Sequence, residues 1–263
     1  MDAIPGLWIG TSGFSYDDWK GPVYPEKIPK TQWFDYYATL FNTLELNSSF
    51  YAFPGEKTIA SLCRRAPQRF LFTVKAHRSI THERRVDGLP VYVNVLKSFE
   101  SKGFSPLALY QFPFSFRPDP DTMAYLQKCV EACPFPYFVE FRNQEWIRPD
   151  PFDSLQKMRV PLVSVDEPAL KGLLPRRVYD KDFLYIRFHG RNAQKWWNHE
   201  QAYERYDYDY TPEELEEWIL PLLESEAPVK VVYFNNHFRG QAVRNAKLLA
   251  EQLEKRKEQG RYP

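Results

Sequence analysis

The sequence predicts an α/β fold, a single-domain (β/α)8 TIM barrel over residues 1–263. Eight short apolar segments, the first starting at residue 7 and the last at 229, recur about every 32 residues, which is the size of a βα unit. Strands that alternate with helices form parallel sheets, and eight of them in about 250 residues most simply close into a barrel. The alternative is an open doubly wound sheet, but GTSGF after the first strand is too short for its Gly-rich phosphate loop.

Each expected strand either alternates apolar and polar residues or is a short apolar run between turn signals. The strands are expected at 7–13, 43–50, 69–77, 106–113, 137–143, 161–166, 183–190 and 229–236. Helices are expected near 32–41, 57–65, 89–98, 122–132, 152–158, 212–224 and 241–254. Thr211 is the expected N-cap of the helix at 212–224, and the segments 20–29 and 191–210 are expected as loops.

Composition excludes several protein classes. Lys and Arg number 35 against 34 Asp and Glu, so net charge gives no argument for nucleic acid or anionic membranes as partners. No apolar run approaches the roughly 20 residues of a membrane helix, and MDAIPGLWIG lacks the features of a signal peptide, so we expect a cytoplasmic protein. The cysteines, Cys63, Cys129 and Cys133, lack disulfide or metal spacing and are expected to be buried hydrophobes, with Cys129 and Cys133 sharing a helix face.

Polar side chains cluster near the C-terminal ends of the expected strands. In YFVEFRNQEW, for example, Glu140 and Arg142 share one strand face. Alternate strand residues of a barrel point inward, and its active site forms at the C-terminal mouth. The residues expected there are Glu45, Asn47, Lys75, His77, Gln111, Glu140, Arg142, Asp166, Arg187, His189, Ser12 or Thr11, and Asn235 or Asn236. The acids and bases could simply neutralise one another as a buried network, but their concentration at one end favours a ligand site.

Two further segments indicate a ligand class. The chain turns through Gly240 into its last helix, and a helix N-terminus at this end of a barrel often binds phosphate, with Arg191 on the neighbouring unit able to complete the site. The alternative is that Gly240 only makes a turn. The aromatic-rich loop 191–210 is typical of a lid, and we expect Trp196 or Trp197 to border the mouth. His82 is expected in a loop.

The chain also resembles the YecE-like domain-of-unknown-function family, whose members are TIM barrels without an established reaction. The resemblance rests on IGTSGFSYDDW followed by GPVYP, LNSSFYAFP, FTVKAHRSITH, YQFPFSF, VEFRNQEW, RFHGR and YFNNHFRGQAVRNA. These motifs run from Leu7 to about Leu253, nearly the whole chain. Ser49 and Asn143 depart from the family pattern, where Thr and His are common. The resemblance therefore implies the barrel and supplies no reaction.

These observations predict an enzyme that acts on a small anionic or phosphorylated polar molecule by acid–base chemistry. The expected catalytic residues are Glu140, Arg142, His77, Lys75 and His189, with Lys75 also a candidate for imine chemistry. The expected substrate-binding residues are Glu45, Asn47, Gln111, Asp166, Arg187, Arg191, Trp196, Asn235, Asn236 and Gly240. Glu45, Glu140, Asp166 and His189 are metal-ligand types, but the bases among them favour a site without metal or other cofactor. The alternatives are a metal-dependent phosphoesterase acting on nucleic acid and a non-catalytic binding barrel.

Overall fold

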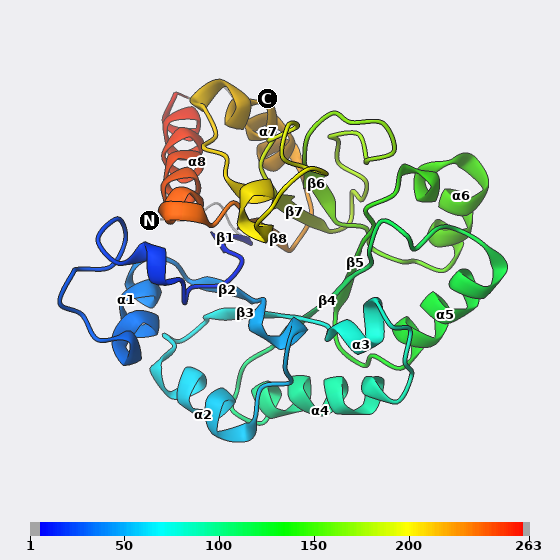
Figure 1. The fold of residues 1–263 in the computed structure, drawn as a ribbon, viewed down its shortest axis with the longest axis horizontal. Helices are drawn as coiled ribbons and strands as arrows, with labels where there is room; N and C mark the ends of the chain where they lie inside the picture. Colours follow the sequence, from blue (N-terminus) through cyan, green and yellow to red (C-terminus); the bar gives the residue numbers. More distant parts are fainter. Residues whose placement is uncertain (1–5, 260–263) are drawn as a thin grey trace.

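The computed structural model describes residues 6–259 and has eight parallel strands with helices around them (Figure 1). The strands are β1 (Leu7–Thr11), β2 (Thr43–Leu46), β3 (Leu71–Lys75), β4 (Leu107–Gln111), β5 (Tyr137–Glu140), β6 (Ser164–Asp166), β7 (Leu184–Phe188) and β8 (Lys230–Phe234). Every predicted strand segment contains one of them. The strands are shorter than predicted, because the polar residues at their C-terminal ends belong to the loops that form the mouth.

The α-helices follow the predicted positions closely. They are α1 (Trp33–Leu40), α2 (Glu56–Arg65), α3 (Arg78–Thr81), α4 (Gly88–Glu100), α5 (Pro120–Glu131), α6 (Pro149–Lys157), α7 (Pro212–Glu224) and α8 (Gln241–Glu258). Short 3-10 helices are η1 (Asp17–Trp19), η2 (Lys30–Gln32), η3 (Ser48–Phe50), η4 (Gln144–Ile147), η5 (Ala202–Tyr206) and η6 (Phe238–Gly240). Thr211 caps α7 as predicted, since its side chain accepts a hydrogen bond from the backbone N–H of Glu214.

The strands close into a barrel. They form two continuous hydrogen-bonded groups, in the orders β1-β8-β7-β6 and β2-β3-β4-β5. Parallel bridges from Ser12 to Glu45 and from Val139 to Leu162 join the two groups at both seams. The predicted (β/α)8 TIM barrel is therefore confirmed.

Two local predictions need correction. The strand–helix repeat is broken once, because the connection 167–183 between β6 and β7 contains no helix. The predicted helix face shared by Cys129 and Cys133 is wrong, because α5 ends at Glu131 and Cys133 lies beyond it. Both cysteines, like Cys63, are free and buried, as predicted. None of the helices in residues 6–259 combines the length and apolarity that a membrane crossing requires.

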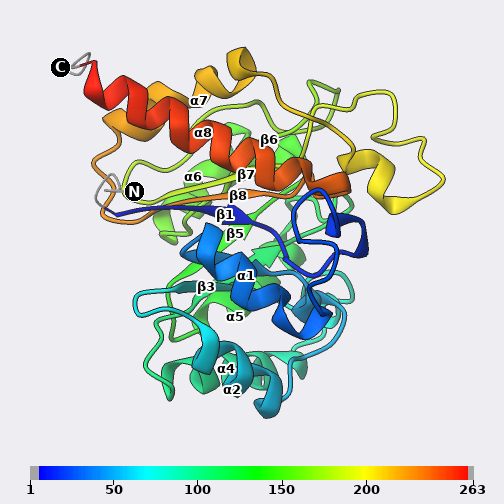
Figure 2. The ribbon, with the colours of Figure 1, turned by 90° about the vertical axis from the view of Figure 1, so that its left-hand side faces the viewer.

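The barrel interior changes from aromatic to charged along the strands. Phe138 and Tyr185 pack together in the interior with ring centroids 4.9 Å apart, and the Tyr233 hydroxyl contacts the side-chain hydroxyls of Thr43 and Thr73. The next inward residues toward the C-terminal ends are polar. Figure 2 shows the loop that carries η5 (yellow) extending from the same end of the barrel as the loop after β1 (blue). This end is the mouth.

Candidate functional site

Strand register determines which polar side chains share the mouth. Paired residues of parallel strands face the same side, so Glu140 of β5 lies on the inner face with Gln111 of β4, and Arg187 of β7 with Tyr233 of β8. The same alternation brings together most of the predicted residues. They are Glu45, Asn47, Lys75, Gln111, Glu140, Arg142, Arg187, His189 and Asn235. Ser12, rather than Thr11, joins them, with its hydroxyl 3.4 Å from Arg187.

Arg187 lies at the base of the mouth and joins two carboxylates. Its Nη1 donates to Oε2 of Glu140 at 2.5 Å, and its Nη2 donates to Oε1 of Glu45 at 2.6 Å. The Tyr185 hydroxyl donates to the other oxygen of Glu45 at 2.7 Å. Arg187 is only 1 % exposed. Its guanidinium is therefore committed to the protein and has little access to a ligand.

Arg142 forms a second layer above Arg187. Its Nε lies 2.5 Å from Oε1 of Glu140, and its Nη1 donates to Glu167 at 3.2 Å. Burial opposes ionisation of Glu140, but the guanidiniums of Arg142 and Arg187 outweigh it and hold the pKa of Glu140 well below its usual range. Glu140 is therefore a permanent carboxylate at neutral pH.

His189 is neutral in this setting. Burial, followed by the nearby Arg142, lowers the pKa of His189 well below its usual range. Its Nδ1 lies 3.1 Å from the amide nitrogen of Asn235 and 3.4 Å from Nη2 of Arg142, both of which can only donate. Nδ1 is thus the acceptor, and the ring proton is on Nε2, which faces Oε1 of Glu140 at 3.2 Å.

Glu167 belongs to the site, and the sequence analysis missed it. It is fully buried, accepts from Arg142 and accepts from the backbone N–H of Leu174 at 3.1 Å. Burial raises the pKa of Glu167 to about 7, although Arg142 opposes the shift. The sequence has two adjacent acids here, Asp166 and Glu167, and Glu167 rather than the predicted Asp166 faces the mouth.

Lys75 differs from the arginines because it has no acidic partner. Among residues 6–259, no carboxylate oxygen lies within 4.0 Å of its amine. The half-buried side chain instead places Nζ over the ring of Phe50, 4.4 Å from its centroid. Burial and the positive charge of Arg187 lower the pKa of Lys75 to about 7. A substantial fraction of this amine is therefore neutral at physiological pH.

The histidines near Lys75 have different surroundings. His77 is the N-cap of α3, where Nδ1 accepts from the backbone N–H of Ser79 at 3.1 Å while Nε2 lies 3.2 Å from the carbonyl oxygen of Tyr51. Both its ring nitrogens are occupied, so the geometry supports a capping role rather than the predicted general base. His82 follows α3 in a turn, as predicted, and burial together with Lys75 lowers its pKa to about 4.

Asp166 and Arg191 are not at the mouth, which corrects the sequence analysis. Asp166 pairs with Phe188, whose ring packs against Trp218 of α7, so both face the helix layer. The Asp166 carboxylate accepts from Trp218 Nε1 at 2.8 Å, from the hydroxyl of Tyr210 at 2.8 Å and from both Nε and Nη2 of Arg191. Arg191 is further bound by a carboxylate of α7. Neither residue is available to a ligand in the mouth.

Asn236 and Gly240 also lie elsewhere. The Asn236 amide donates to Asn245 of α8 at 2.7 Å, because Asn236 follows Asn235 just beyond β8 and faces outward. Gly240 has a φ of +72°, and a Cβ at this position would lie 2.6 Å from Val23. The predicted anion position is occupied from within the protein, since the backbone N–H of Arg239 donates to Asp18 at 2.6 Å. Gly240 thus serves the turn and the packing.

The loop 191–210 covers one side of the mouth. Trp196 is 1 % exposed, and its ring lies 6.0 Å from the guanidinium carbon of Arg142, so it borders the mouth as predicted. Trp197 is 47 % exposed and points away, against Phe114. Tyr206 of η5 lies 6.3 Å from the ring of His189.

His237 is a further mouth residue that the sequence analysis missed. Its ring stacks on Tyr16 at 4.3 Å and lies 6.3 Å from Tyr206. Burial lowers the pKa of His237. Because it follows the last strand in a loop, strand alternation could not place it.

Several buried polar atoms at the mouth lack a well-aligned hydrogen-bond partner. Three of them contact one another, since Oε1 of Glu140 lies 2.5 Å from Nε of Arg142 and 3.2 Å from Nε2 of His189. Oδ1 of Asn47 has no such contact. Buried polar groups are normally satisfied, so Oδ1 of Asn47 is the atom here with capacity to bind a polar ligand. Within residues 6–259, no three His, Cys, Asp or Glu side chains are grouped as a metal-binding set.

Comparison with known proteins identifies the family. The sequence model of a family described as "Protein of unknown function DUF72" matches residues 8–263. The chain belongs to the DUF72 family. This finding confirms the YecE-like resemblance carried by the sequence motifs.

Relatives cover nearly the whole chain. The UPF0759 protein YunF of Bacillus subtilis is 30 % identical over 94 % of this chain and 95 % of its own length. The crystal structure of a DUF72 family protein from Thermotoga maritima is 36 % identical, covers 94 % of this chain and 99 % of its own, and has a TM-score of 0.85. One from Enterococcus faecalis has a TM-score of 0.81 at 23 % identity, with coverage of 94 % and 95 %. The chain therefore shares the fold of these DUF72 structures over about 94 % of its length.

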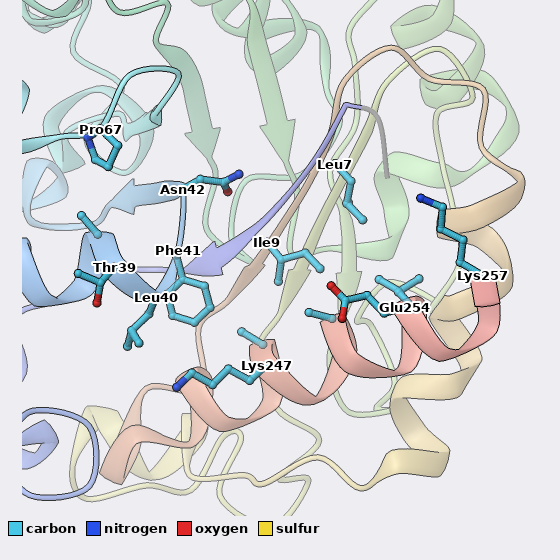
Figure 3. Close-up of a pocket in the computed structure, with 14 residues that line it drawn as sticks. Leu7, Ile9, Thr39, Leu40, Phe41, Asn42, Pro67, Lys247, Glu254 and Lys257 are labelled. Atoms are coloured by element: carbon cyan, nitrogen blue, oxygen red, sulfur yellow. The ribbon is translucent and has the colours of Figure 1, made fainter. Parts of the chain in front are cut away.

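Two cavities of this DUF72 chain lie outside the mouth. One, of about 380 Å³, lies between β1, α1 and α8, and Figure 3 shows Ile9 and Phe41 facing it with Lys247 and Glu254 of α8. The other, of about 890 Å³, lies beside the helix-free connection after β6 and includes Phe183. Both belong to the helix layer and contain none of the charged residues of the mouth.

Proposed function

We propose that this DUF72 protein is an enzyme that acts on a small polar, anionic or phosphorylated molecule at the mouth of the barrel, by acid–base chemistry without a metal. The observation that carries the proposal is Lys75, a half-buried residue whose amine has a pKa of about 7 and no carboxylate within 4.0 Å among residues 6–259. Enzymes place general acids and bases near pH 7 by burial and by neighbouring charge.

A second titrating group supports acid–base chemistry. Glu167 also has a pKa of about 7, and Arg142 lies between it and Glu140. Enzymes raise the pKa of a glutamate and lower that of a lysine toward neutral pH, by burial and neighbouring charges, to use them as acid–base groups. His189 stays neutral and directs its Nε2 proton at Glu140, so its part in this arrangement is to orient that carboxylate.

The charge distribution supports an anionic substrate. Arg142 and Arg187 are each bound to two carboxylates, so the positive charge left for a ligand is that of the protonated fraction of Lys75. Nearby amides add neutral polar contacts, and Oδ1 of Asn47 is buried without a partner. An acceptor of this kind suits a substrate hydroxyl. We infer a substrate with at least one anionic group and one hydroxyl.

Binding and turnover can be tested together. The protein is mixed with inorganic phosphate, glycerol 3-phosphate and ribose 5-phosphate; thermal unfolding reports binding, and phosphorus NMR reports conversion. We expect a raised unfolding midpoint that is lost in Lys75→Met and kept in Lys128→Met, a change on the exposed face of α5. Binding without conversion of any compound favours the non-catalytic barrel. Equal midpoints in all three proteins contradict a role for Lys75.

A further inference from the structure

We propose that Lys75 forms an imine with its substrate, which makes the substrate a small aldehyde or ketone that carries an anionic group. The inference rests on the proposed function, because it names the chemistry of the same mouth. Its basis is geometric. Lys75 is the C-terminal residue of β3, on the inner face of the barrel, and its half-buried side chain places Nζ 4.4 Å from the centroid of the Phe50 ring.

Other lysines of the described chain lack this combination. Lys30, Lys102 and Lys195 are paired with carboxylates near the surface. Lys230 is 6 % exposed and has a lowered pKa through burial, but it is the first residue of β8, at the opposite end of the barrel. Only at Lys75 do an unpaired amine and the polar mouth coincide within residues 6–259.

The surroundings of Lys75 keep its amine available as a nucleophile. Charged and titratable groups face it from several elements: Glu45 of β2, His82 after α3, Glu140 at the end of β5, Arg142 after it and Arg187 of β7. Burial and Arg187 favour the neutral amine, and the two glutamates oppose them. Because Arg187 forms ion pairs with both of those glutamates, its positive charge offsets most of their electrostatic effect on Lys75. An amine that is desolvated and next to a cation is activated in this way for imine formation.

The reaction balances without any oxidant or reductant. The lone pair of the neutral Lys75 amine attacks the carbonyl carbon, and a carbon–nitrogen bond forms as the carbonyl π bond opens. The carbonyl oxygen then leaves as water, taking two protons that the nitrogen loses. The product is a carbon–nitrogen double bond that joins Lys75 to the substrate, and water reverses the step.

The imine can be trapped chemically. The protein is incubated at pH 7 with glyceraldehyde 3-phosphate, a small phosphorylated aldehyde, and sodium cyanoborohydride, which reduces an imine to a stable secondary amine. Peptide mass spectrometry then compares labelling at Lys75 with labelling at the exposed Lys128. An ordinary lysine has a pKa near 10.4, so its neutral fraction at pH 7 is roughly a thousandfold smaller. We expect labelling at Lys75 to exceed that at Lys128 at least tenfold, and to rise with pH up to about pH 8.

Two controls separate this inference from the proposed function on which it rests. Lys75→Arg keeps the positive charge but removes the nucleophile, so it should abolish the label and retain stabilisation by inorganic phosphate. Unphosphorylated glyceraldehyde should label Lys75 more weakly. If phosphate stabilises the protein but Lys75 is labelled no faster than Lys128, the imine is refuted and the proposed function stands. If phosphate neither stabilises the protein nor slows labelling when it is added as a competitor, and Lys75 is labelled no faster than Lys128, the imine and the proposed function are both refuted.

Discussion

Replacing Arg187 by Met tests whether the base of the mouth is held together by a buried ion network. The change removes the guanidinium that joins Glu45 and Glu140, in a position only 1 % exposed. Glu140 keeps its contact with Arg142, whereas Glu45 keeps only the hydroxyl of Tyr185. One buried carboxylate is therefore left without a cation. Removal of one partner of a buried pair costs roughly 3–5 kcal/mol, so we expect a loss of that size in the free energy of unfolding.

Urea unfolding at pH 7, followed by circular dichroism, measures the loss. The double variant Arg187→Met with Glu45→Gln removes the orphaned charge and should recover at least half of it. The loss should also shrink toward pH 5, because a buried carboxylate without a cation has a raised pKa and takes up a proton in the folded state. A loss below about 1 kcal/mol, or no recovery in the double variant, refutes the assignment of Arg187 as a structural ion-pair partner.

Three smaller predictions follow from local geometry. Gly240→Ala should lower the free energy of unfolding by roughly 1–3 kcal/mol, because the φ of Gly240 is +72° and an added Cβ would lie 2.6 Å from Val23. An unchanged melting temperature would contradict this. Thr211→Ala should cost about 1 kcal/mol in urea unfolding by removing the side-chain cap of α7, and Thr211→Ser should restore most of it. Asp166→Asn should lower the free energy of unfolding by about 1–3 kcal/mol, because it weakens the contact with Arg191. It should leave imine trapping at Lys75 unchanged, and reduced trapping would show that Asp166 does contribute to the mouth.

The sequence was sufficient for the barrel and for the central charged cluster of the candidate site. Strand alternation placed Glu45, Glu140 and Arg187 on inner positions, and the structure joins these three directly. The prediction worked because each of these strands carries its polar residues two positions apart, separated by residues that must face the helices. In such a pattern, the opposite parity would turn a charged side chain toward the hydrophobic layer.

Prediction failed where two polar residues are adjacent. In Asp166–Glu167 and Asn235–Asn236, either member can be the inward one, and only pairing with the neighbouring strand decides. Here Glu167 and Asn235 face inward, while Asp166 and Asn236 bind groups of the helix layer. Residues placed by loops, such as His237, were also beyond reach, because loop conformation has no periodic pattern. The lowered pKa of Lys75 depends on its burial and on its distance from Arg187, and neither can be read from the sequence.

The sequence analysis weighs a neutralising buried network against a ligand site, but the structure makes the two compatible, because the ion network lies next to Lys75. Arg187 binds both carboxylates that would otherwise hold Lys75 in its charged form, and its own charge opposes that form as well. Arg187→Met should therefore raise the pKa of Lys75 and shift the pH profile of trapping at Lys75 to higher pH. At pH 7 the labelling rate should fall, and near pH 9 it should approach that of the parent protein. Because the variant is also less stable, circular dichroism must show it folded at each pH. An unshifted profile in the folded variant would mean that burial alone sets the reactivity of Lys75.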